Sequence, residues 1–146
     1  MNTRPIPRRA LLLGAAGLPL IARPAAAWTI GDLYGDVTAD GLQLSPGARA
    51  QLGRRITVTG YMAPPLKAES DFFVLTRFPM SVCPFCSNAA DWPTDIVVIN
   101  LTRASDMLGA AYAIEVSGVL EYGAKIDPGT GFVSLVRLVE ARWRRV

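Results

Sequence analysis

The residues best suited to chemistry are two cysteines, Cys83 and Cys86, which lie in the segment 80–88, Met-Ser-Val-Cys-Pro-Phe-Cys-Ser-Asn. They are the only cysteines of the 146-residue chain, which contains no histidine. Without histidine, the chain has no Ser-His-Asp or Cys-His nucleophile pair and no histidine-ligated metal or haem centre. The candidate chemistry therefore rests on two neighbouring thiols, and three uses of such a pair are open.

The first use is a structural disulfide between Cys83 and Cys86. An exported protein would form this bridge because its compartment is oxidising. The bridge would close a loop of only four residues, and its stabilisation by loop entropy is roughly 2 kcal/mol, at the low end for disulfides. A core of this size does not obviously need so weak a bridge, so stability alone explains the motif poorly.

The second use is thiol-disulfide exchange, with Cys83 as the attacking thiol and Cys86 as the resolving thiol. Pro84 favours a helix start directly after Cys83, where the helix dipole lowers a thiol pKa. The Cys-Pro-Phe-Cys tetrad resembles the active-site motif of glutaredoxins and related thioredoxin-fold oxidoreductases. Their motif opens a long helix, whereas here Trp92-Pro93 leaves room for some two turns before the next strand.

The third use is a soft-metal site. Two thiolates and the thioether of Met80, three residues before Cys83, form a ligand set suited to Cu(I). Zn(II) would need two more donors, such as Asp91, Asp95 or a side chain of a partner. Each of these residues also has a purely structural interpretation, since Met80 suits a core and the two aspartates suit a capped turn around the Trp92 indole.

The elements that position this segment are mostly strands. Five segments combine apolar or alternating residues with turn signals at their ends: 54–62, 71–78, 95–101, 112–122 and 132–143. Short helices are expected between Ser45-Pro46 and Gly53 and at 102–108. Three strands, a short helix and two hairpin-linked strands follow the order of an OB-type barrel, and Gly60 offers a bend in the first strand. We therefore predict an all-β fold, a small five-stranded OB-like barrel with one or two short helices.

The chain divides into an export signal (1–27), a lead-in segment with a short helix (28–53) and the barrel (54–146). The first 27 residues hold four arginines, no acid, an apolar run at 10–22 and three alanines at the end, which is the layout of a secretory signal. Arg8-Arg9 resembles a twin-arginine export signal, although Pro7 stands where Ser or Thr is usual. We expect cleavage after Ala27, a periplasmic protein and no permanent membrane anchor, because a spanning helix needs about 20 apolar residues.

The charge balance changes when the signal is removed. The full chain has 15 basic and 12 acidic residues, and the remainder after Ala27 has 11 and 12. This slightly acidic balance gives no support for a nucleic-acid partner. Glu115 and Glu121 fall on the polar side of an alternating strand, where we expect them to be solvated. The basic end, Arg142, Arg144 and Arg145, is expected to keep a strand edge soluble.

Several features occur together: the Arg-Arg signal, Gly60-Tyr61-Met62-Ala63-Pro64 at the end of the first strand, and the Cys-Pro-Phe-Cys loop between two apolar strands. In this combination the chain resembles a group of small uncharacterised bacterial exported proteins, of the kind seen beside ABC-type transport components. The resemblance implies an exported location and this fold. By association it implies a link to envelope or metal transport, and it implies no reaction.

Taken together, these features predict a periplasmic binding or accessory module more than an enzyme. The chain has no phosphate-binding glycine motif and no paired catalytic carboxylates, while both cysteines occupy one loop. The expected partners are an envelope transport component or another periplasmic protein, and the expected cofactor, if one is bound, is copper or zinc. The alternative is a periplasmic thiol-disulfide oxidoreductase that uses Cys83 and Cys86.

Overall fold

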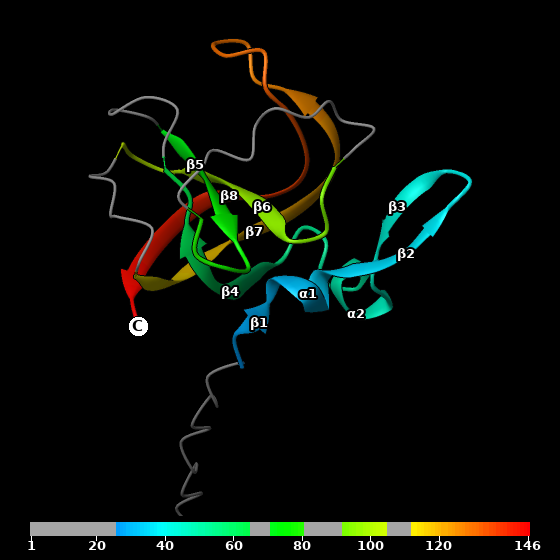
Figure 1. The fold of residues 1–146 in the computed structure, drawn as a ribbon, viewed down its shortest axis with the longest axis horizontal. Helices are drawn as coiled ribbons and strands as arrows, with labels where there is room; N and C mark the ends of the chain where they lie inside the picture. The colour runs from blue at the N-terminus through cyan, green and yellow to red at the C-terminus, as the bar shows by residue number, and fades with distance from the viewer. Residues whose placement is uncertain (1–25, 65–70, 81–91, 105–111) are drawn as a thin grey trace, which may run out of the picture.

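The computed structural model describes residues 26–64, 71–80, 92–104 and 112–146. As predicted, this part of the chain is mostly β with two short helices (Figure 1). None of the helices in the described ranges is long and apolar enough to cross a membrane. The elements in chain order are β1 (Trp28–Thr29), α1 (Ile30–Leu33), β2 (Tyr34–Thr38), β3 (Gly41–Leu44), α2 (Pro46–Arg49), β4 (Arg55–Met62), β5 (Phe72–Thr76), β6 (Ile96–Leu101), β7 (Ala113–Ile126) and β8 (Val133–Arg145).

Six of the strands form one sheet in the order β1-β4-β5-β6-β8-β7, and an additional pairing joins β7 back to β4. Within the cycle from β4 through β5, β6, β8 and β7 to β4, every pairing is antiparallel except that of β6 with β8. Each strand of this cycle therefore has a partner on both sides. The predicted strand segments correspond to these five strands, with β7 extending four residues beyond the predicted end at Tyr122.

The lead-in segment contains more elements than the single short helix that was predicted. It contributes β1, which pairs in parallel with β4, and a separate two-stranded sheet of β2 and β3 that projects to one side in Figure 1. Ala39 and Asp40 form the turn of this hairpin, and Gly41, the first residue of β3, has a φ of 98°. Gly31 and Asp32 lie within α1, and Gly35 and Asp36 lie within β2, so glycine and aspartate do not interrupt the short elements of this segment.

The predicted short helices have different outcomes. The helix after Ser45 is present, and the Ser45 hydroxyl accepts a hydrogen bond from the backbone N–H of Ala48 at 3.1 Å. It ends at Arg49, earlier than the predicted stop at Gly53, and the chain continues in turns. The predicted helix at 102–108 lies mostly outside the described residues, and its described part, Thr102–Ala104, is not helical.

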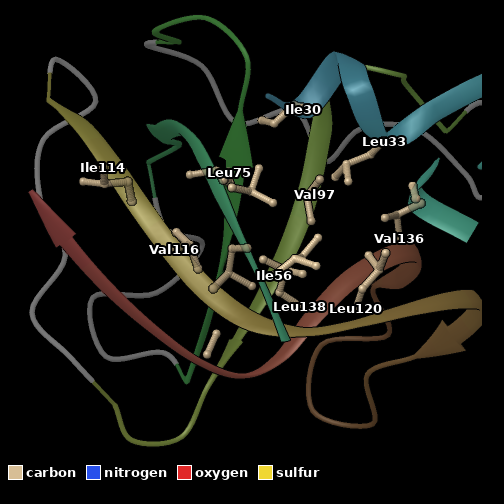
Figure 2. Close-up of a cluster of buried hydrophobic side chains, with 14 of the residues drawn as sticks. Ile30, Leu33, Ile56, Leu75, Val97, Ile114, Val116, Leu120, Val136 and Leu138 are labelled. Carbon is tan, nitrogen blue, oxygen red and sulfur yellow. The ribbon is translucent and has the colours of Figure 1, made fainter. Parts of the chain in front are cut away.

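The strands bury apolar side chains on both sides of the sheet. Figure 2 shows the inner cluster, where side chains from β4 to β8 point toward one another and α1 covers one side with Ile30 and Leu33. A second cluster lies on the outer side of β5 and β6. All five residues of β5 are buried, as expected from its uninterrupted apolar sequence. The outer cluster consists of Leu42, Ala63, Phe72, Val74, Trp92, Ile96 and Val98, with Tyr34, Phe132 and Leu135 packed against it.

Candidate functional site around the cysteine segment

The cysteine segment begins after β5 and ends before β6. Cys83, Cys86 and Asp91 lie outside the described residues, so their roles as disulfide, redox pair or metal ligands remain predictions. The two other candidate ligands are described: Met80 is half-buried before the segment, and Asp95 directly precedes β6. Within the ranges that the structure describes, no three His, Cys, Asp or Glu side chains gather into a metal site.

Backbone contacts fix the base of this segment. Thr76, the last residue of β5, pairs with Ile96, the first residue of β6, and the next N–H, of Arg77, donates to the Asp95 carbonyl at 2.9 Å. Thr76 also pairs with Tyr61 of β4, so the end of β4 lies beside the start of the cysteine segment. The end of β4 and the residue that precedes the cysteine segment in β5 therefore lie at the same end of the sheet.

Trp92 anchors the other end of the segment. Its side chain is buried, with 8% of the residue exposed, and the indole N–H donates to the Tyr34 hydroxyl at 3.0 Å. That hydroxyl in turn donates to the Ile96 carbonyl. The sequence predicted a half-buried indole in a capped turn, and the structure instead buries the indole and gives it a partner 58 residues away.

Burial raises the pKa of the Tyr34 phenol above its ordinary value, and the nearby Asp95 carboxylate adds to this effect, against the hydrogen bond from Trp92. An unfolded tyrosine ionises near pH 10, while Tyr34 stays neutral in the folded protein at that pH. The hydrogen-bonded Tyr34 phenol therefore stabilises the fold fully below pH 10. Above pH 10 this stabilisation is lost, because the unfolded state gains free energy from ionising the phenol.

We therefore expect Tyr34→Phe to have a pH-dependent effect. Near pH 8 it should lower the free energy of unfolding by about 1–3 kcal/mol, because the Trp92 N–H and the Ile96 carbonyl lose their partner. Above pH 10 the difference from wild type should shrink, since only the wild type has a penalty for keeping this phenol neutral. Urea unfolding of both proteins at pH 8 and pH 11 measures this. An equal difference at both pH values would contradict the assignment.

A chain of aromatic rings continues from Trp92 across the outer cluster. The centroid of the Trp92 ring lies 6.3 Å from that of Phe132, and Phe132 stacks on Phe72 with centroids 6.1 Å apart. Phe132 follows the β7–β8 turn and Phe72 begins β5. The end of the cysteine segment is thus packed through aromatic contacts against the β7–β8 hairpin.

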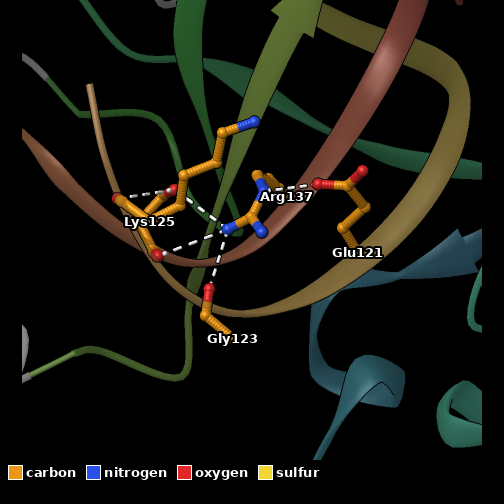
Figure 3. A network of polar contacts seen from close by, with 5 residues as sticks. Glu121, Gly123, Lys125 and Arg137 are labelled. Atoms are coloured by element: carbon orange, nitrogen blue, oxygen red, sulfur yellow. Dashed lines mark hydrogen bonds and ion pairs between the residues drawn. The ribbon is translucent and has the colours of Figure 1, made fainter. Parts of the chain in front are cut away.

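Arg137 of β8 is a buried charge that sequence reasoning did not identify. Its side chain is 9% exposed, and its Nε donates to a Glu121 carboxylate oxygen at 2.7 Å (Figure 3). Its Nη1 donates to the Gly123 carbonyl at 2.8 Å and lies 3.3 Å from the Ser134 hydroxyl. The only sequence signal was an arginine between Val136 and Leu138, in a strand that was expected to alternate.

The other charged candidates also have partners. Glu121 is held by Arg137, and Glu115, whose side chain is 20% exposed, pairs with Arg144. The expectation that both carboxylates are merely solvated is therefore wrong, because adjacent strands β7 and β8 place an arginine opposite each of them. At the same end of β8, the Arg145 guanidinium lies 4.8 Å from the centroid of the Tyr112 ring.

Comparison with known proteins gives little beyond this geometry. No protein-family model matches the chain, and no curated protein does. Among solved structures, the chain is similar to the crystal structure of a DUF3299 family protein from Pseudomonas aeruginosa PAO1, with a TM-score of 0.46 and 14% sequence identity. The match covers 72% of this chain and 67% of that chain. A likeness at this level carries no conclusion about activity.

Proposed function

We propose that this protein is a periplasmic binding or accessory module in which the loop carrying Cys83 and Cys86 is the functional edge. The observation that carries the proposal is that hydrogen bonds hold both ends of the loop. Arg77 and Trp92, on either side of the segment, are tied to Asp95 and Tyr34 by hydrogen bonds of 2.9 and 3.0 Å. A fixed base limits the conformations of the loop and favours a defined arrangement of its thiols.

The scaffold of the proposed module is a five-stranded OB-like barrel made of β4, β5, β6, β7 and β8. Its support is the cyclic pairing of these strands, with a single parallel contact between β6 and β8. Strands β1 to β3 then belong to the lead-in segment, in which β1 pairs with β4 and β2 and β3 form a separate sheet. In OB-type barrels, loops at the rim carry the binding function.

The proposed location is the periplasm, reached by removal of residues 1–27. The supporting feature is the sequence layout of the first 27 residues. The proposed partner is an envelope or metal transport component, by the resemblance described above. Nucleic acid is not a proposed partner, because the chain after Ala27 is slightly acidic.

The proposed ligand of the reduced loop is Cu(I), bound by the thiolates of Cys83 and Cys86 with Met80 as a third donor. Soft sulfur ligands select Cu(I), and two or three of them satisfy its low coordination demand. Met80 is half-buried at the start of the loop, only three residues before Cys83. Zn(II) would need oxygen donors from Asp91, Asp95 or a partner.

A competition titration with a Cu(I) chelator tests this assignment. We expect one Cu(I) per wild-type chain, loss of binding in Cys83→Ser, and weaker binding in Met80→Leu. The matched control is Met62→Leu, because Met62 is fully buried in the inner cluster and a Met-to-Leu exchange there is well tolerated. Binding that survives Cys83→Ser, or that falls equally in both methionine variants, would refute the ligand set.

The competing function is a thiol-disulfide oxidoreductase with Cys83 as the attacking thiol and Cys86 as the resolving thiol. A turnover assay with a disulfide substrate and glutathione separates the two functions. The binding module should show no turnover in the wild type or in Cys83→Ser. Turnover in the wild type that disappears in Cys83→Ser would establish the oxidoreductase instead.

A further inference from the structure

One edge of β8 is open beyond the point where β6 ends. The parallel pairing of β6 with β8 stops at Leu101 and Ala141, and the Thr102 N–H adds one bond to the Ala141 carbonyl, at 3.2 Å. Around Glu140, whose φ is 49°, β8 carries an extra residue relative to both neighbouring strands. Such a bulge bends a strand and can end its pairing. Beyond Ala141, β8 therefore pairs only with β7 among the described strands.

The backbone of this edge can pair with a further strand. Backbone N–H and C=O groups of successive residues in a strand point to opposite sides. The Val146 N–H donates to the Ala113 carbonyl on the β7 side, at 3.3 Å, whereas the Ala141 carbonyl points to the opposite side, toward the end of β6. Trp143 and Arg145 have the parity of Ala141, so their N–H and C=O groups face the open side. In the described part of the chain, no strand pairs with these groups.

A hollow of about 470 Å³ lies along the same edge, between the end of β6 and the C-terminal part of β8. Leu101 and Trp143, both packed against the inner cluster, contribute apolar surface to it. Arg103 and Arg142 contribute positive charge, and none of its described lining residues is acidic. Successive side chains of a strand point to opposite faces, so Arg142 and Trp143 lie on different faces of β8. The open edge therefore has a basic face and an apolar face.

The positive charge of this hollow is not balanced. Glu140, in the adjoining hollow, and Glu115 of β7 are each paired with another arginine. Arg103 and Arg142 are exposed, and neither guanidinium has a hydrogen-bond or ion-pair partner within the ranges that the structure describes. Acidic side chains of a partner complement such a surface. A second copy of this chain does not, because it would bring its own arginines against these.

We infer that the open edge of β8 binds an extended segment of a partner protein in which acidic and apolar residues alternate. The segment adds a strand beside Trp143 and Arg145 and pairs with their backbone groups. Its carboxylates face Arg103 and Arg142, and its apolar side chains lie against Trp143. This interaction goes beyond the proposed function of the cysteine loop, because it assigns a surface to a protein partner and uses neither thiol. Its affinity is the same in the wild type and in Cys83→Ser.

The probe is a blocked peptide that alternates glutamate and valine, and the protein produced from the full chain is titrated with it by calorimetry. Two control peptides separate the two features of the edge. One replaces each glutamate by glutamine, and the other keeps the glutamates but carries methyl groups on the backbone nitrogens that would face β8. We expect saturable binding of the probe. Each control should bind about tenfold more weakly or worse, because it lacks the charges or the backbone hydrogen bonds.

Amide hydrogen exchange locates the bound peptide. The N–H groups of Trp143 and Arg145 face the open side, so they should exchange at least about tenfold more slowly when the peptide is bound. The Arg144 N–H faces β7 and should change little, which makes it the internal control. Protection that develops elsewhere, and not at this edge, would overturn the inference.

Variants test the charges. Arg142→Gln should weaken binding of the probe about threefold, and the double variant with Arg103→Gln about tenfold. Arg49→Gln is the matched control, because it removes one charge from α2, which Figure 1 shows on the other side of the molecule from the C-terminus. It should change the affinity by less than about twofold.

Several results would contradict the inference. They are the absence of saturable binding, equal binding of the probe and either control peptide, and an unchanged affinity in the double variant. Dimerisation of the free protein, with the same protection of Trp143 and Arg145, would make a second copy the occupant and would also overturn it. Unchanged binding in Cys83→Ser is expected, and it would show that this surface works whether or not the cysteine loop has its proposed function.

Discussion

Gly60→Ala should lower the free energy of unfolding by about 3 kcal/mol, because the centre of β4 has no room for a methyl group. A Cβ at this position would lie 2.7 Å from the Thr76 carbonyl oxygen, 2.9 Å from Leu75 Cγ and 3.1 Å from Ile30 Cδ1. The first of these is a backbone atom at the base of the cysteine segment, so relief requires β4 and β5 to separate.

Urea unfolding of Gly60→Ala beside Gly129→Ala measures this effect. Gly129 lies in the β7–β8 turn, where an added Cβ would meet only the Asp127 carboxylate at 3.5 Å, an ordinary contact. We expect the control to stay within about 0.5 kcal/mol of wild type. Similar stability losses in the two variants would contradict the close approach of β4 to β5.

Trp92→Ala should lower the free energy of unfolding by about 3–5 kcal/mol, the range for deleting a large buried aromatic side chain. The indole is buried in the outer cluster, contacts the Phe132 ring and donates to Tyr34. Its removal also releases one end of the cysteine segment. We therefore expect the affinity for Cu(I) to fall as well.

The control for Trp92→Ala is Trp28→Ala, at a partly exposed indole that packs over Gly47. It should cost less stability and leave Cu(I) binding unchanged. Denaturant unfolding and the chelator titration give both quantities for both variants. If Trp28→Ala reduced Cu(I) affinity as much as Trp92→Ala, the link between Trp92 and the loop would be wrong.

The strand content was predictable because the apolar pattern is strong where a strand has one or both faces buried. Ile114, Val116 and Leu120 alternate in the sequence and are all fully buried in β7. The uninterrupted apolar run of β5 indicated burial on both faces, and the outer cluster accounts for it. Local signals for turns also succeeded, since Asp127 and the residues after it form the β7–β8 turn.

The lead-in segment was harder to predict because its elements are short. Strands of two to five residues carry too little periodicity to distinguish them from loops, and their stability comes from contacts with the rest of the fold. Leu33 is fully buried in the inner cluster, and the Tyr122 hydroxyl donates to the Leu42 carbonyl at 2.6 Å. Such contacts between distant segments are invisible in a local pattern.

The candidate site also combines a feature that the local sequence indicates with contacts that it does not indicate. The spacing of Cys83 and Cys86 drew attention to the segment between β5 and β6, and both the structure and the chemistry of the cysteines stay predictions. The groups that hold the loop ends, above all Tyr34, could not be found because nothing in the sequence couples Tyr34 to Trp92 across 58 positions. Arg137 was missed for a similar reason, since its partner Glu121 belongs to the neighbouring strand.

The reduction potential of the Cys83–Cys86 pair tests the central claim most directly. The protein is isolated from the cell envelope without reductant, its mass and metal content are determined, and the pair is equilibrated with glutathione buffers. A functional loop predicts a potential above about −300 mV, so that the pair can be reduced and can take up Cu(I). A bridge with a potential below about −300 mV would be an inert structural disulfide, and it would contradict the assignment of this loop as the functional edge.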